Sequence, residues 1–382
     1  METIQELSPN ETIGLSILDD LFDEDAQKET YVEVDTSDVE TFSIGTPQIT
    51  THTQQLGRYN YEDALGEGAY GTVWRAQDID IGRSVAIKSY KFTGNVGEKL
   101  LRMETNIAGK IDHPGVPVLY DVKKTEDGQY HFIMKYIEGE TLESVIKRLK
   151  DGDDETHHQY GQEKRAELIL QILRVLVSAH KQNIIHRDIK AENIMIGTAG
   201  EAYLMDWGIA VNFKQNSGEG QLAGSPRYMS PEQASKKALD QRSDLYSLAA
   251  VMYEFMSLRR HGPETNDVQE ILKALPNFHL TMSAMMPHPK YGGIPVQFGA
   301  LIQKGLQNNP DDRFQSAQDM MFALEQAISG NVEVSCPFTL TLRATRMIEQ
   351  MLANHPFISM GFFLTIFGSM LYGMYSLVML AF

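Results

Sequence analysis

The chain has 382 residues, of which 42% are hydrophobic and 22% charged, so it has the composition of a globular protein with room for one two-lobed domain or two small ones. Its formal net charge is −17, and no segment is rich enough in Lys and Arg to neutralise a phosphate backbone, which argues against a nucleic-acid partner. The single cysteine, Cys336, excludes an internal disulfide and fits a reducing compartment.

The first 57 residues hold most of the negative charge, with thirteen Asp or Glu residues and one Lys. They are rich in Ser and Thr and poor in aromatic side chains, so they cannot bury enough apolar surface to offset the entropy lost on ordering. We therefore expect residues 1–57 to be a mostly disordered acidic tail. Within this tail, Gly14–Phe22 contains apolar residues at helical spacing, namely Leu15, Leu18, Leu21 and Phe22. The segment is either a short amphipathic helix that forms on a partner or a chance apolar cluster.

From Tyr59 the sequence changes to short β-branched and aromatic runs separated by glycine, which is typical of strands. Strands are predicted over 59–65, 72–77, 84–90, 116–123 and 130–136, and the apolar spacing predicts a helix over 96–110. After Gly139 the pattern is helical, with helices predicted over 142–150, 164–182, 243–257, 265–275, 295–307 and 316–329. A β-rich portion followed by an α-rich portion predicts an α+β fold of two lobes, over 58–138 and 139–330, with a ligand cleft between them.

The end of the sequence has a different character. After a predicted connector over 331–355, residues 356–382 contain no charged side chain. As a helix this run would be roughly 40 Å long, which exceeds the ~30 Å hydrocarbon core, so a single membrane-spanning helix is predicted. A stripe of small residues could pair two such helices or be accidental; it consists of Gly361, Thr365, Ser369 and Gly373.

The stretch His186–Asn193 carries the strongest chemical signal. An Asp near a Lys, with an Asn five residues further on, can accept a hydroxyl proton, neutralise a transferring phosphoryl group and bind a metal ion. The alternative is a charged surface loop. The stretch therefore predicts phosphoryl transfer if the other parts of such a site are present.

A glycine-rich segment and a lysine supply those parts. Gly66, Gly68 and Gly71 lie between two predicted strands. The same glycine spacing also opens dinucleotide-binding helices, but here a strand follows the last glycine, so a hairpin can close over phosphates. Lys88, fifteen residues after Val73, lies in a neighbouring strand where it can pair with phosphate oxygens, and Glu104 on the next helix can pair with it.

Together these motifs, over about residues 59–330, resemble the eukaryotic-type (Hanks-type) Ser/Thr protein kinases, and Gly224–Gln233 is similar to the substrate-binding loop of their bacterial receptor-like group. The resemblance implies that Asp188 is the catalytic base, that Lys190 is a partner for the γ-phosphate, and that Asn193 and Asp206 bind Mg²⁺, or Mn²⁺ in its place. It further implies that ATP is held by Leu65, Gly66, Glu67, Gly68, Ala69, Tyr70, Gly71, Thr72, Val73, Ala86, Lys88, Glu104, Met134, Tyr136, Ile137 and Met195, with Met134 as gatekeeper and residues 135–137 as the hinge.

The same resemblance assigns structural roles. Ser230–Glu232 would close the activation loop with Arg313 as a buried ion-pair partner, and Asp244 would hold the catalytic loop. Two positions depart from the family pattern. Trp207 replaces the usual Phe, and it is expected to stack on an unusually small Ala108.

The second departure is in the activation loop, where Gln221 stands at a position that is a phosphorylatable Thr in many relatives. We therefore expect Arg187 to be neutralised by an anion at Ser217 or Glu219.

The resemblance, together with the uncharged run over 356–382, thus predicts a membrane-anchored Ser/Thr kinase with its catalytic domain in the cytoplasm, where ATP is available. Its partners would be protein substrates, the membrane, and itself, through autophosphorylation of the tail and of Ser217 or Ser225 and through a homodimer. One alternative is a pseudokinase scaffold that binds a nucleotide or a partner without turnover. Another is a small-molecule kinase of similar fold.

Overall fold

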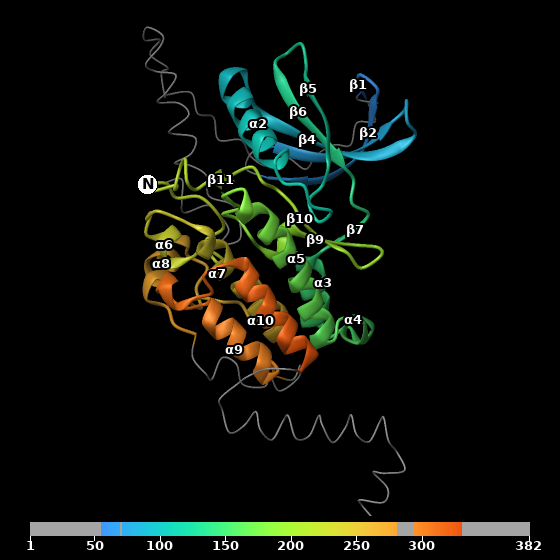
Figure 1. Ribbon diagram of the computed structural model, residues 1–382. Coiled ribbons are helices and arrows are strands. Elements are labelled where there is room, and N and C mark those ends of the chain that lie inside the picture. Colours follow the sequence, from blue (N-terminus) through green and yellow to red (C-terminus); the bar gives the residue numbers. More distant parts are fainter. Residues whose placement is uncertain (1–54, 69–70, 281–292, 331–382) are drawn as a thin grey trace, which may run out of the picture. The chain divides into compact units, whose positions relative to one another are not determined.

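The computed structural model describes residues 55–68, 71–280 and 293–330 (Figure 1). The predicted tail up to residue 54, Ala69 and Tyr70, and the predicted connector and membrane helix over 331–382 lie outside the described residues. Within the described ranges, no helix is long and apolar enough to cross a membrane.

The first lobe is an antiparallel sheet of six strands in the order β1-β2-β3-β4-β6-β5. Its strands are β1 (Gln55–Leu56), β2 (Tyr59–Glu67), β3 (Gly71–Asp78), β4 (Arg83–Thr93), β5 (Leu119–Lys124) and β6 (Gln129–Lys135). One helix, α2 (Gly94–Ala108), packs on this sheet, and Leu101 lies in one apolar cluster with Tyr90 and Phe132 (Figure 1).

Alternation along the strands gives the sheet a second apolar face. Ile87 and Ile133, which are paired across β4 and β6, are fully buried in a cluster with Tyr59. Their neighbours Lys88 and Phe132 therefore point to the opposite face, which is the face that carries α2.

Two sequence predictions for this lobe need correction. Gln55 and Leu56 fall within the predicted disordered tail, yet they pair with β2 as β1. Gly57, at φ 61°, allows the tight turn between these strands, and Leu56 is buried against the sheet. In addition, β5 begins at Leu119 rather than at residue 116, because Val116 belongs to a turn in which its N–H donates to the carbonyl of His113.

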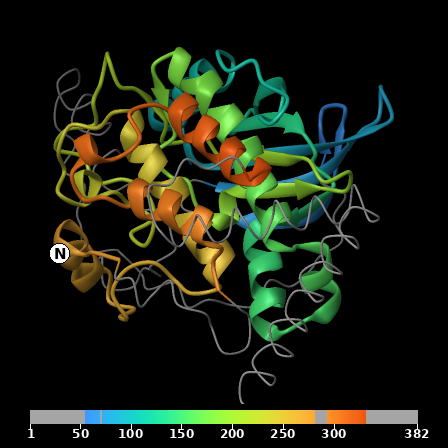
Figure 2. The same ribbon diagram turned by 60° about the horizontal axis from the view of Figure 1, so that its bottom comes forward.

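The second lobe is helical, as predicted, and its long helices are α3 (Leu142–Asp151), α5 (Gln162–Lys181), α7 (Gln241–Ser257), α9 (Val296–Gly305) and α10 (Ala317–Ser329). Shorter helices are α4 (Asp154–Gln159), α6 (Pro231–Ala234) and α8 (Val268–Ala274). Every residue of α7 from Ser243 to Ser257 is buried, so α7 is the core of this lobe, packed against α5 and α9 (Figure 2). The sequence analysis missed α4, because its sequence DETHHQ has no apolar period.

Short strands connect the lobes to the site. β7 (Gly139–Thr141), β9 (Ile194–Gly197) and β10 (Ala202–Leu204) form one sheet, and β8 (Ile184–Ile185) pairs with β11 (Val211–Asn212). The segment 186–193 lies between β8 and β9 in the chain, and residue 206 lies between β10 and β11. The two predicted parts of the site are therefore brought close together.

A buried histidine makes the stability of this lobe depend on pH. His261 is 4% exposed, its Nε2 lies 2.9 Å from the hydroxyl of Tyr246, and burial lowers its pKa to about 4. The unfolded chain protonates this imidazole near its ordinary pKa of ~6.5, so between the two values the unfolded state binds more protons. We expect the free energy of unfolding to fall by up to about 3 kcal/mol as the pH drops from 6.5 to 4.

Urea unfolding of the protein and of His261→Gln at several pH values measures this loss. The variant keeps a hydrogen-bonding side chain but does not titrate, so its stability should depend less steeply on pH over that interval. Equal slopes for the two proteins would show that His261 does not carry the effect.

Candidate active site

Three charged side chains from different elements meet at Lys88 on β4. The Nζ of Lys88 lies 2.9 Å from Oε2 of Glu104 on α2 and 2.7 Å from Oδ1 of Asp206, which follows β10. Lys88 and Glu104 are buried, whereas 41% of the Asp206 side chain is exposed. The predicted Lys88–Glu104 pair is therefore present, and Asp206 joins it.

The charges at this point stabilise each other. Burial opposes the charge on Lys88, but Asp206 and Glu104 outweigh it and raise the pKa of the ammonium. Desolvation likewise opposes the charge on Asp206, but Lys88 lowers the pKa of that carboxyl to about 2. At neutral pH the lysine is an ammonium that faces two carboxylates, which is the charge state needed to bind a polyphosphate.

Tyr90 is a further residue of the site that was not predicted, and its hydroxyl donates a hydrogen bond to Glu104. Its burial, followed by the charge on Glu104, raises the pKa of the phenol well above its ordinary value, so the hydroxyl stays a donor. Tyr90 could have been found from the sequence, because it lies two residues after Lys88 in a strand and its side chain therefore points to the same face.

The segment 186–193 folds around Asp188, which is 3% exposed. The amide of Asn193 donates to Oδ2 of Asp188 at 3.1 Å, and Nζ of Lys190 lies 3.6 Å from the same oxygen. Asp188 and Lys190 come directly before a 3₁₀ turn over Ala191–Asn193. The backbone carbonyl of Asn193 accepts from the N–H of Met205 at 2.8 Å, which ties this segment to the residue before Asp206.

Asp244 of α7 fixes the backbone of that segment, as predicted. Its carboxylate accepts from the N–H of His186 at 2.9 Å and from the N–H of Arg187 at 3.0 Å. The ring of His186 is held as well: Nδ1 accepts from the N–H of Asp188, and Nε2 lies 2.9 Å from the carbonyl of Met205. This pattern requires the neutral tautomer with its proton on Nε2.

Two backbone conformations are strained at this site. Arg187 and Asp206 have φ values of 70° and 56°, in the left-handed region that residues other than glycine rarely adopt. Arg187 lies between His186 and Asp188, and Asp206 follows Met205; the backbone N–H groups of these neighbours all donate hydrogen bonds within the site. Such strain persists only where the surrounding structure imposes it. The backbone is thereby set to aim Asp188 and Asp206 toward Lys190 and Lys88.

The predicted nucleotide-binding residues line the strands next to Lys88. The β2–β3 hairpin carries Gly66, Gly68 and Gly71, and the N–H of Gly68 donates to the carbonyl of Gly71 at 2.8 Å. A side chain at Gly71 would meet the backbone of Ser89 at 2.2 Å, so only glycine fits there. The hairpin also carries Leu65, which is 47% exposed, Glu67, Thr72 and Val73.

The remaining predicted contacts come from β4, the hinge and β9. Ala86 is buried on β4, and Met134, at the end of β6, packs against the cluster of Leu101 and Phe132. Tyr136 and Ile137 follow β6, and Met195 on β9 pairs with Thr141. Only Ala69 and Tyr70 of the predicted set cannot be placed, because they lie outside the described residues.

The donor set suits a magnesium ion that is bound together with phosphate. Asn193 and Asp206 offer oxygen atoms, and Mg²⁺ in phosphoryl-transfer sites uses one or two carboxylates plus phosphate oxygens and water. Among the residues that the structure describes, no group of three or more His, Cys, Asp or Glu side chains could hold a metal by itself. Asn193 and Asp206 therefore fit Mg²⁺ that is bound together with a nucleotide.

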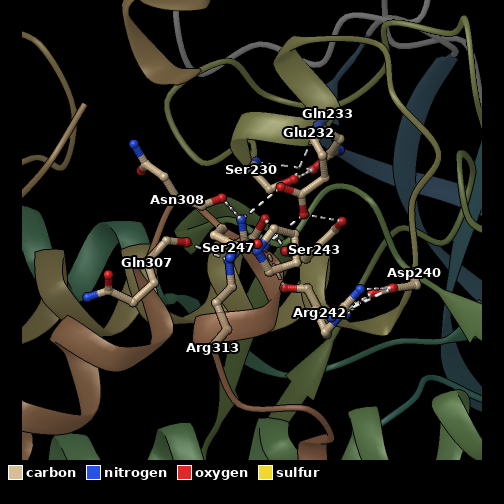
Figure 3. Close-up of polar contacts among 12 residues, drawn as sticks. Ser230, Glu232, Gln233, Asp240, Arg242, Ser243, Ser247, Gln307, Asn308 and Arg313 are labelled. Atoms are coloured by element: carbon tan, nitrogen blue, oxygen red, sulfur yellow. Dashed lines mark hydrogen bonds and ion pairs between the residues drawn. The ribbon is translucent and has the colours of Figure 1, made fainter. Parts of the chain in front are cut away.

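A buried ion pair anchors the segment after the site (Figure 3). Arg313 donates to both carboxylate oxygens of Glu232, at 2.7 and 2.8 Å, and Ser243 donates to Glu232 at 2.6 Å. Arg313 also donates to the carbonyl of Asn308. The predicted pairing of the Ser230–Glu232 segment with Arg313 is confirmed.

Gln233, which the sequence analysis did not single out, connects this segment to the site. Its side-chain amide donates to the carbonyl of Arg187 at 2.7 Å and to that of Ala223 at 3.0 Å. It also completes a capping box with Ser230 at the start of α6. No local pattern predicts the first two contacts, because they join residues that are far apart in the chain.

The first departure from the family pattern concerns Trp207 and Ala108. The ring of Trp207 lies edge-on to His186, with centroids 4.6 Å apart, and Nε1 donates to the carbonyl of Leu204. Ala108 packs against the cluster of Leu101 and Phe132. Direct stacking of Trp207 on Ala108 stays a prediction.

Arg187 has a neutral partner in the structure. Nη1 of Arg187 donates to the amide oxygen of Gln221 at 3.2 Å, and the pairing of Arg187 with an anion at Ser217 or Glu219 stays a prediction. Ser225 is 2% exposed, so its hydroxyl cannot be an acceptor of phosphate in this conformation. Of the two predicted loop sites, only Ser217 is partly exposed.

Comparison with known proteins agrees with this geometry. Residues 59–323 match the protein kinase domain family. The chain is 29% identical over 291 residues to serine/threonine-protein kinase PknB of Mycobacterium leprae, covering 74% of this chain and 45% of the relative. It is 31% identical over 279 residues to PknH of Mycobacterium bovis, covering 72% and 42% of the two chains. It is 30% identical over 280 residues to PrkC of Bacillus subtilis, covering 72% and 41%.

The chain thus spans less than half the length of these relatives. The matched region nevertheless includes both lobes and every residue described at the site, and it covers more than half of this chain. The chain belongs to the protein kinase domain family.

Proposed function

We propose that this chain is an ATP-dependent protein kinase that transfers the γ-phosphoryl group to Ser or Thr hydroxyls. The observation that carries the proposal is the convergence of Lys88, Glu104 and Asp206 beside the Asp188–Lys190–Asn193 cluster. The names of the relatives, all serine/threonine-protein kinases, support the same class of acceptor.

Each residue has a separate task in this reaction. Mg²⁺-ATP, when bound, would supply the γ-phosphoryl group, with ADP as the leaving group. Lys88, held by Glu104, orients the nucleotide phosphates, and Asp188 accepts the proton of the substrate hydroxyl. Lys190 neutralises the charge that develops on the transferred group, and Asn193 and Asp206 would hold the metal.

The test is a radiolabelled-ATP assay of the full chain with a generic basic protein and with the chain itself as acceptor. Lys88→Met should lower transfer by about 10²-fold or more, since a positioned donor to the reacting phosphates is lost. Lys147→Met, an exposed lysine on α3, serves as the matched control and should keep full activity. ATP binding without transfer in the unaltered chain would instead favour the pseudokinase alternative.

We also propose that the predicted helix over 356–382 anchors the protein in a membrane, with the catalytic domain in the cytoplasm. The absence of charge over 27 residues supports this.

The full chain should resist extraction from membranes by alkaline carbonate. Ile366→Arg together with Leu371→Arg should release it, because two charges near the middle of the span oppose insertion. Ile366→Ala with Leu371→Ala is the matched control and should stay in the membrane. Protein that is extracted equally well with and without the arginines would contradict the anchor.

Pairing of two such helices would favour autophosphorylation between chains. The small-residue stripe over 361–373 supports this part of the proposal. Ser369→Leu with Gly373→Leu should lower both the yield of crosslinked dimer and the autophosphorylation in membranes. Unchanged levels of both would exclude the stripe as the dimer contact.

A further inference from the structure

A groove on the first lobe has no role in the chemistry above. It lies between α2 and the strands β5 and β6, has a volume of about 570 Å³, and is lined by residues that include Leu101, Arg102, Thr105, Val122, Lys124 and Tyr130. Figure 1 shows α2 beside these two strands. We call it the α2 groove.

The α2 groove has an apolar floor and a polar rim. Leu101 and Tyr130 are buried in its floor, and Val122 is 36% exposed. On the rim, Nζ of Lys124 lies 4.9 Å from the centroid of the Tyr130 ring, and Arg102 pairs with Glu98 on the outer face of α2. Such a surface suits an occupant that combines apolar side chains with acidic ones.

The charge around the α2 groove is opposite to that of the chain as a whole. Of the charged residues that line the groove, Arg102 and Lys124 are basic and Glu98 is acidic, so the lining has a net positive charge. The whole chain has a formal net charge of −17, and its first 57 residues have thirteen acidic residues and one Lys. The groove and the acidic tail are therefore complementary in charge.

The tail contains one segment that also matches the floor of the groove. Gly14–Phe22 places four apolar residues at helical spacing, and acidic residues follow or interrupt them at Asp19, Asp20, Asp23, Glu24 and Asp25. The 32 residues between Phe22 and Gln55 could span about 100 Å when fully extended, more than enough to reach α2 from β1. Because the segment and the groove belong to one chain, the effective concentration of the segment at the groove is raised to roughly the millimolar range.

We propose that Gly14–Phe22 of the same chain binds in the α2 groove. Its apolar side chains cover Leu101, Val122 and Tyr130, and its acidic residues face Arg102 and Lys124. The occupant holds α2 against β5 and β6. Because α2 also carries Glu104, the bound segment would favour the Lys88–Glu104 pair, and this regulatory consequence rests on the proposed kinase function.

Disulfide trapping in the full chain tests the binding itself. In a Cys336→Ser background, Phe22→Cys combined with Val122→Cys should form a disulfide within one chain on mild oxidation with oxidised glutathione. Phe22→Cys combined with Phe322→Cys is the control, because Phe322 is 61% exposed on α10, far from the α2 groove in sequence and on the other lobe. We expect a several-fold higher yield for the first pair.

Equal yields for both pairs would overturn the proposal, and so would a disulfide that forms only between chains, since the occupant would then be a second copy. Activity is the separate readout. Thr105→Asp, which adds a like charge to the groove lining and leaves the cysteine at position 122 in place, should lower the trapping yield and, in the chain without the added cysteines, the rate of phosphoryl transfer. Val118→Asp, at a valine that is 56% exposed just before β5 and outside the groove lining, should change neither.

The two readouts keep this inference distinct from the proposed function. A chain that transfers phosphate but shows no preferential trapping would refute the bound segment and leave the kinase function in place. A chain that is trapped but inactive would refute the function and leave the binding site in place. Trapping that survives in Lys88→Met would confirm that binding does not need catalysis.

Discussion

Replacing Asp188 with Asn is expected to lower phosphoryl transfer by about 10²–10⁴-fold, the usual contribution of a positioned general base. An amide at this position cannot accept the proton of the substrate hydroxyl. It can still accept the hydrogen bond from Asn193, which holds Asp188 at 3.1 Å in the protein, so the fold should be kept. Steady-state transfer to a protein acceptor, with circular dichroism as the check of folding, measures both expectations.

Asp151→Asn, at an exposed position at the end of α3, is the matched control for this change of charge. Asp206→Asn should also reduce transfer, for a different reason, because it removes the negative charge that pairs with Lys88 and that the proposed function assigns to the metal. Near-normal turnover in Asp188→Asn would mean that another group accepts the proton.

The largest expected effect on stability follows from Arg313→Met. Arg313 and Glu232 are 2% and 8% exposed, and removal of one member of a buried ion pair leaves the other charge without compensation. The expected cost is about 3–5 kcal/mol of unfolding free energy. Urea or thermal unfolding measures it, and the loss of activity should follow the loss of folded protein.

Two companions make this expectation specific. Adding Glu232→Gln to Arg313→Met removes the uncompensated charge and should recover part of the loss. Lys164→Met, which removes one member of an exposed pair with Glu167 on α5, should cost less than about 1 kcal/mol. Similar losses for Arg313→Met and Lys164→Met would show that the buried pair contributes no more than a surface pair.

The sequence was sufficient for those parts of the site that depend on local spacing. Lys88, Glu104 and Asp188 could be found because each stands at a fixed distance from glycines, strands or other charges that the sequence displays, whereas Asp206 was assigned through the resemblance to protein kinases. The same holds for the α+β fold, since apolar periods of two and of about 3.6 residues mark its strands and long helices.

Other features depend on contacts between distant residues, which no local pattern contains. The bond from Gln233 to the carbonyl of Arg187 joins α6 to the catalytic segment across 46 residues. The burial of Ser225 and the choice of Gln221 as the partner of Arg187 depend in the same way on how the loop folds back. The contact of the Trp207 ring with His186 likewise joins two separate segments of the chain, and a side-chain volume argument cannot foresee it.

The bond between Arg187 and Gln221 also bears on how a signal through this protein could be ended. A carboxamide is encoded in the gene, and no phosphatase can remove it. The order that this bond gives to the loop is therefore inherited by every copy of the protein at synthesis, without a history of earlier modification. Reversible control has to act on something other than this bond, such as Ser217 of the loop, the amount of protein made, its degradation or a second surface of the domain.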